Sequence, residues 1–105
     1  MKLLSINYIP GQEIEALGMV KGTIVQTKHV GKDFMASMKT LVGGEITSYT
    51  QMLNEARQIA IKRMVDEAKE LGADAVIDIK YGSSQIMAGA AEVIAYGTAV
   101  KYIEQ

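Results

Sequence analysis

Residues 48–81 read SYTQMLNEARQIAIKRMVDEAKELGADAVIDIKY, and this stretch decides the fold. Its first part repeats apolar residues every three or four positions, which is the spacing of one helical face. Ser48 with Gln51 three residues later is a capping-box start, and Gly72 is a natural left-handed stop. After Gly72 the pattern changes to the alternation of a strand. The stretch therefore predicts a long helix over 48–72, followed by a strand over 73–81.

One side of this predicted helix is apolar and the other is charged. A single broad apolar face means that the helix lies on another layer, most simply a sheet. The apolar stripe consists of Leu53, Ala56, Ala60, Met64, Ala68 and Leu71.

Three further segments have the composition of strands. They cover residues 3–9, 17–30 and 92–103, and β-branched residues are frequent in the second and third. In the last segment Ala95, Gly97 and Ala99 share one side, and small residues let a helix approach a sheet closely. We therefore expect these three residues under the helix, with Gly97 against Ala60.

The remaining segments are predicted as connections or as one short helix. Phe34, Met38 and Leu41 lie at i, i+4 and i+7, which indicates a helical face within residues 32–42. The stretch 82–91, GSSQIMAGAA, is interpreted as a flexible hairpin loop.

The order of these elements predicts an α+β fold. We expect a two-layer β-α-β-β unit, with a mainly antiparallel sheet and one long helix packed on one face. The last strand fits antiparallel between the other two in such a split β-α-β arrangement. A length of 105 residues is typical of one domain, so residues 1–105 are assigned to a single domain.

The sheet face away from the helix is expected to be too apolar to remain exposed to solvent. We therefore predict that a second subunit covers much of it. The oligomer-interface candidates are Met19, Val25, Val76, Ile94, Tyr96, Val100 and Tyr102.

Composition excludes several classes of function. The formal charge is −1, from 11 basic and 12 acidic residues, so no basic stripe exists to bind nucleic acid. The chain has no cysteine, which excludes disulfides, thiolate metal sites and cysteine nucleophiles. No segment is apolar enough for a membrane span or a signal-peptide core. The expectation is a cytoplasmic protein with no nucleic-acid or membrane partner.

Few residues suggest site chemistry. Asp74 and Asp78 lie four positions apart on one predicted strand, a separation of about 13 Å, so one ion cannot bind both directly. The simpler interpretation is that they solvate the face opposite the helix, although a symmetric assembly could gather copies of Asp78 around an axis. His29 is the only histidine, and it is either a surface residue or a metal ligand or base. No catalytic residue is predicted.

Five segments in a fixed order carry a family resemblance, and together they run from Leu17 to Val100. The chain resembles the YbjQ family of bacterial and archaeal proteins, which carries a heavy-metal-binding label. The resemblance implies a dodecin-like subunit and ring-shaped homo-oligomers, commonly pentamers, and it supplies no catalytic residue. The segments are LGMVKGTIV, DFMASMKTLVGGEITSYTQML, ARQIAIKRM, EAKELGADAVIDI and AYGTAV.

These observations lead to two functional hypotheses. The first is a non-enzymatic cytoplasmic homo-oligomer that binds a small ligand or an ion between subunits or in a central channel. The alternative is binding or storage of a divalent metal ion, with copies of His29 or Asp78 as ligands. Soft metals prefer thiolate, thioether or imidazole ligands, so a site here would need repeated copies around an axis.

Overall fold

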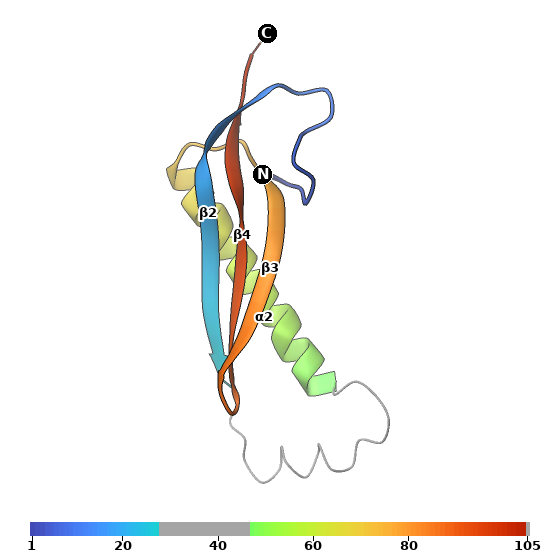
Figure 1. Cartoon of the computed structure of the whole chain (residues 1–105), viewed down its shortest axis with the longest axis vertical. Helices are drawn as coiled ribbons and strands as arrows, with labels where there is room; N and C mark the ends of the chain where they lie inside the picture. Colours follow the sequence, from blue (N-terminus) through green and yellow to red (C-terminus); the bar gives the residue numbers. More distant parts are fainter. Residues whose placement is uncertain (28–46, 105) are drawn as a thin grey trace.

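A helix lies diagonally across one face of a four-stranded sheet (Figure 1). The computed structural model describes residues 1–27 and 47–104. The strand order is β1-β3-β4-β2, with β1 parallel to β3 and the other two pairs antiparallel. The elements are β1 (Lys2–Leu3), β2 (Ile14–Thr27), α2 (Thr47–Glu70), β3 (Ala75–Met87) and β4 (Ala90–Tyr102).

This architecture confirms the predicted α+β class. β4 is hydrogen-bonded to both β2 and β3, which is the central position expected for the last strand. The long helix was also predicted correctly to within about two residues at each end. The predicted helix within 32–42 and the candidate ligand His29 lie outside the described residues.

The end of α2 follows from one glycine. Gly72 has φ +77°, the left-handed conformation that glycine adopts without a steric penalty. The Gly72 N–H donates to the Lys69 carbonyl at 3.0 Å, and the Ala73 N–H donates to the Ala68 carbonyl at 3.1 Å. This pair of bonds is a Schellman motif, so the predicted stop signal is confirmed in detail.

The main core lies between α2 and the sheet. Ala60 is fully buried there, as expected, but the helix approaches the sheet most closely at Gly22 rather than at Gly97. A Cβ atom on Gly22 would meet the Ala60 carbonyl, whereas one on Gly97 would meet Ile77 and Val76 of β3. The buried residues of this cluster are Val20, Ala56, Ala60, Met64, Ala68, Val76, Val93, Ala95 and Ala99.

A β-bulge divides β3 and corrects the predicted faces of this strand. The register with β4 shifts between Ile77 and Lys80, and Asp78 within the bulge has φ +54°. Two residues of β3 therefore oppose one residue of β4, which reverses the alternation of side chains. Val76 packs under the helix, so its predicted place on the opposite face is wrong. Beyond the bulge, Ile79 packs against the same core.

The N-terminal segment covers one end of the other sheet face. Ile9 forms a second buried cluster with Ala75, Ile77 and Val100, and Tyr102 packs against it. Val100 is therefore covered by its own chain, contrary to the expectation that a second subunit would do this. The predicted strand over 3–9 is also wrong, because only Lys2–Leu3 is a strand.

The stretch 82–91 is not a loop. β3 and β4 continue through it and are joined by a two-residue turn at Ala88 and Gly89, where Gly89 has φ +79°. The glycine and serines of this stretch suggested a flexible connection, but pairing with β4 keeps the segment extended.

Candidate functional site: an uncovered sheet face

Part of the sheet face away from α2 has no covering element among the described residues. Met19 is 76% exposed there and Val25 is 52% exposed, although both are large apolar residues. Ile94 and Tyr96 alternate with the helix-facing Val93 and Ala95, and they are half-buried. We call this surface the open face; it consists of Met19, Val25, Ile94 and Tyr96, together with Lys21 and Lys80.

Two lysines flank the tyrosine of the open face. Tyr96 is the cross-strand partner of Lys21 on one side and of Lys80 on the other. Directly opposed residues have Cβ atoms about 4.5–5.5 Å apart, so both lysine stems lie beside the ring. This row offers ammonium groups and a phenol, which suit an anionic or aromatic ligand better than a cation.

Asp78 lies in the bulge of β3 and forms an ion pair with Lys80. Its carboxylate Oδ1 accepts a hydrogen bond from Lys80 Nζ at 2.9 Å, and both side chains remain about half exposed. This hydrogen bond and the negative charge of Asp78 raise the pKa of Lys80 above its ordinary value of 10.5. The ion pair therefore stays formed through the neutral pH range.

Asp74 has a separate structural partner. Its Oδ2 accepts a hydrogen bond from the backbone N–H of Tyr102 at 2.8 Å, which ties the start of β3 to the end of β4. The two aspartates thus bind different groups. No cluster of three or more His, Cys, Asp or Glu side chains occurs within residues 1–27 and 47–104.

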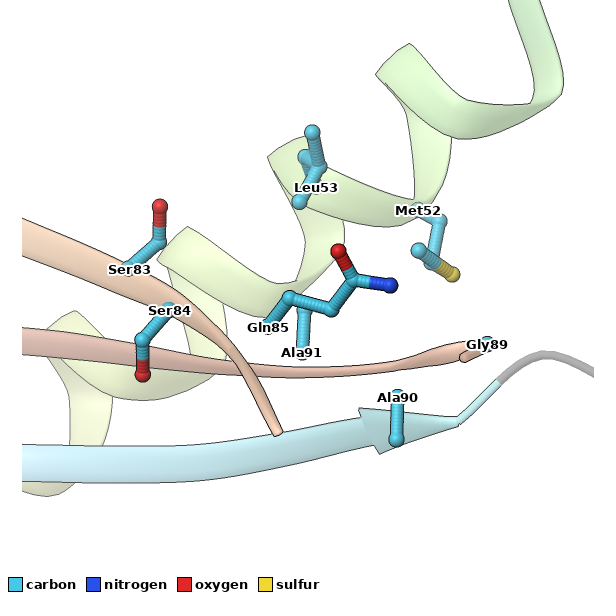
Figure 2. A pocket seen from close by; sticks show the side chains of 8 residues that line it. All are labelled: Met52, Leu53, Ser83, Ser84, Gln85, Gly89, Ala90 and Ala91. Atoms are coloured by element: carbon cyan, nitrogen blue, oxygen red, sulfur yellow. The ribbon is translucent and has the colours of Figure 1, made fainter. Parts of the chain in front are cut away.

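A pocket of about 310 Å³ lies at the hairpin end of the molecule (Figure 2). Met52 and Leu53 from the start of α2 form its apolar side, and Ser83 and Gln85 from β3 supply a hydroxyl and an amide group, whereas the Ser84 hydroxyl points away from the helix. None of its lining residues titrates near neutral pH, so the pocket offers hydrogen bonds but no acid–base group. Sequence patterns did not predict this pocket, because GSSQ was interpreted as loop.

A polar pocket of about 650 Å³ lies at the opposite end and includes Asp74, Lys101 and Glu104. Two of its charged side chains form hydrogen bonds with the backbone. Asp74 binds the Tyr102 N–H, and Lys101 Nζ donates to the Gly72 carbonyl at 3.3 Å. These hydrogen bonds connect the ends of β3, β4 and α2, so we assign the charged residues of this pocket a structural role.

The described helix offers no membrane span, because it is not apolar enough over a sufficient length.

Comparison with known proteins places the chain among close relatives. A family model with the description "Putative heavy-metal-binding", named YbjQ, matches residues 1–103. A "UPF0145 protein" of Clostridium novyi is 60% identical over 103 residues, which cover 98% of this chain and 100% of the relative. A "UPF0145 protein" of Alkaliphilus metalliredigens is 56% identical, with the same coverage of 98% and 100%.

A solved structure shares the fold. It is a protein of unknown function from Pediococcus pentosaceus that belongs to the DUF74 family. The superposition has a TM-score of 0.65 and covers 98% of each chain, at 19% sequence identity. At this identity the likeness supports the fold and carries no functional residue.

Proposed function

Since this chain belongs to the YbjQ family, we propose that it works as a non-enzymatic homo-oligomer that binds a small ligand or an ion between its subunits. The observation that carries this proposal is the open face. Two of its apolar side chains, Met19 and Val25, are more than half exposed on a sheet whose other face is a packed core.

Burial of the open face supplies a driving force for association. Fully burying an apolar side chain of this size contributes about 1.5–3 kcal/mol. An assembly repeats this contribution in every subunit, and the half-buried Ile94 and Tyr96 add to it. Exposed apolar residues on one sheet face, here with Lys21 and Thr23 between Met19 and Val25, are a feature of interaction surfaces.

The same face suggests where a ligand would bind. Subunits that meet through the open face would bring the Lys21–Tyr96–Lys80 row to the contact. Lys80 is already neutralised by Asp78, so Lys21 carries the charge that a bound anion could use. A small anionic ligand is thus the species that this surface favours.

Light scattering on the purified protein tests the assembly. We expect a mass that is a multiple of the 11.4 kDa chain, and five times that mass for the pentamer implied by the resemblance. Met19→Glu with Val25→Glu should shift the mass to that of one chain, because both changes place charge in the proposed contact.

The matched control is Ile59→Glu, which introduces the same charge at a 37% exposed apolar residue of α2. This variant should keep the wild-type mass. A wild-type mass of 11.4 kDa at micromolar concentration would refute the proposal.

The family description favours a second candidate function, which is metal-ion binding or storage. A site would need ligands from several subunits, since no described part of one chain gathers three metal-binding side chains. Calorimetric titration of tag-free protein with zinc, copper and nickel separates the two candidates. A heat of metal binding that disappears in His29→Ala or Asp78→Asn would favour metal binding. If none of the three metals gives a heat of binding, the first proposal is favoured.

A further inference from the structure

The β2 edge of the sheet and the β3 edge of the sheet differ in how their backbone groups are covered. On β2, Arg63 Nη1 of α2 donates to the Thr23 carbonyl at 2.6 Å. The Lys21 N–H donates to Glu67 Oε1, also from α2, at 3.4 Å. Charged helix side chains therefore occupy the middle of this edge, which is one way in which proteins prevent further strand pairing.

The other edge, on β3, is covered over only part of its length. β1 pairs with Ala75 and Val76, and the following residues continue this cover. The Asp78 N–H donates to the Ile6 carbonyl at 2.8 Å, and the Ile79 N–H donates to the Leu4 carbonyl at 3.1 Å. The bulge at Asp78 coincides with the end of this cover, and bulges commonly terminate pairing.

Beyond the bulge, β4 is the only described strand that pairs with β3. We call the segment Lys80–Met87 the β3 edge. Tyr81, Ile86 and Met87 are 55%, 50% and 65% exposed within it. It contains no proline and no charge except that of Lys80, which is bound to Asp78. The protections that proline and unpaired charge give to an exposed edge are thus missing between Lys80 and Gln85, and a second shift of register with β4 follows between Gln85 and Met87.

A groove lies beside the β3 edge on the helix side. It is a pocket of about 130 Å³, lined by Leu53 and Arg57 of α2, by Val93 of β4 and by Tyr81, Gly82 and Ser83. A second pocket, of about 360 Å³, lies where the N-terminal cover ends and is lined by Leu3, Leu4, Ser5, Ile61, Ile79 and Tyr81. A strand added to the β3 edge would place alternate side chains toward this groove, because strand side chains alternate between faces. The backbone and the groove together form the two parts of a strand-binding site.

We propose that the β3 edge pairs with a strand of a second copy of this chain. The occupant is a second copy because the β3 edge borders the open face at Lys80 and Tyr96, so one neighbour can cover both. A stable interface buries about 800 Å² on each partner, more than one eight-residue edge supplies. This inference rests on the proposed homo-oligomer and adds the surface that extends the sheet between subunits.

Site-directed photo-crosslinking tests this pairing. The chain has no cysteine, so Ser83→Cys accepts a maleimide benzophenone at one position on the β3 edge. Lys62→Cys on α2 is the control, since the Lys62 side chain is 76% exposed and lies away from the sheet edge. Irradiation should give covalent dimers from the Ser83 variant well above the Lys62 variant, with the crosslink mapped to a strand of another copy.

Light scattering and circular dichroism on the same labelled samples separate the possible failures. An oligomer without Ser83 crosslinks above the control, or with crosslinks only inside one chain, would overturn the β3 edge pairing alone. A monomer in both labelled variants and in the unlabelled protein would overturn the proposed function. Dissociation of the Ser83 variant alone, with its secondary structure intact, would support the pairing, and Gln85→Cys should reproduce it.

Discussion

At the scale of single residues, Asp78 illustrates how a polar side chain in an apolar strand can have a backbone role. Its φ of +54° is in the left-handed region, which aspartate and asparagine tolerate better than most residues. The bulge that it permits turns Val76 toward the helix and ends the cover of the β3 edge. Among the described residues, the carboxylate itself binds Lys80 alone, at an exposed site.

Substitutions at Asp78 should therefore follow backbone preference rather than charge. We expect Asp78→Asn to change the free energy of unfolding by less than about 0.5 kcal/mol, as at an ordinary surface site. Asp78→Val should lower it by about 1–3 kcal/mol, because a β-branched residue is strained at positive φ. Urea unfolding followed by circular dichroism measures both, and equal effects of Asn and Val would contradict the backbone role.

The pH dependence at this site has a definite sign. The pKa of Lys80 is raised in the folded state, so the stability contributed by its ion pair is complete below the unfolded pKa near 10.5. It is lost as the pH rises through the higher folded value. The difference between wild type and Asp78→Asn should therefore stay constant from about pH 6 to 9 and shrink as the pH rises through the folded pKa of Lys80.

At the scale of elements, the contact between α2 and β2 depends on a glycine, Gly22, which has no side chain to hold the helix away from the strand. A Cβ atom on Gly22 would lie against the Ala60 carbonyl and the Met64 backbone nitrogen, neither of which can move without moving the helix. The alanines at positions 56, 60 and 68 make the helix side of this contact equally small. Close packing, rather than large apolar volume, holds the two layers together.

Gly22→Ala should consequently lower the free energy of unfolding by about 1–3 kcal/mol through overpacking. Lys62→Ala is the control, because the Lys62 side chain of α2 is 76% exposed, and its effect should be much smaller. Thermal unfolding of both variants provides the comparison. An unchanged melting temperature in Gly22→Ala would show that the helix can shift away from β2 at little cost.

At the scale of the whole molecule, the sheet has two differently covered faces and two differently covered edges. α2 buries one face, while the N-terminal segment buries only the end of the other around Ile9. The open face and the β3 edge remain exposed side by side. Both surfaces therefore support the proposed assembly.

The proposed assembly also affects stability. A ligand or partner that binds only the folded state stabilises it by mass action, so the melting temperature of an oligomer rises with protein concentration. We expect this rise in the wild type and not in the Met19→Glu, Val25→Glu variant. A melting temperature independent of concentration in both proteins would argue against association through the open face.

The sequence by itself determined the elements whose signals are local. The apolar stripe of α2, its stop at Gly72, and the small residues of β4 are short-range patterns, and they predicted the helix and the helix-facing side of β4 correctly. The open-face positions Met19, Val25, Ile94 and Tyr96 followed from the same alternation. The α+β class followed from the order of these elements.

Tertiary structure decided the features that depend on long-range pairing. The bulge at Asp78 reverses the faces of β3, and no local pattern reveals it because a one-residue slip depends on the register with β4. Pairing also turned residues 82–87 into strand, although glycine and serine favour a turn. The cover of Val100 by Ile9 and the closure of the β2 edge by Arg63 join residues far apart in sequence, and only the folded chain brings them together.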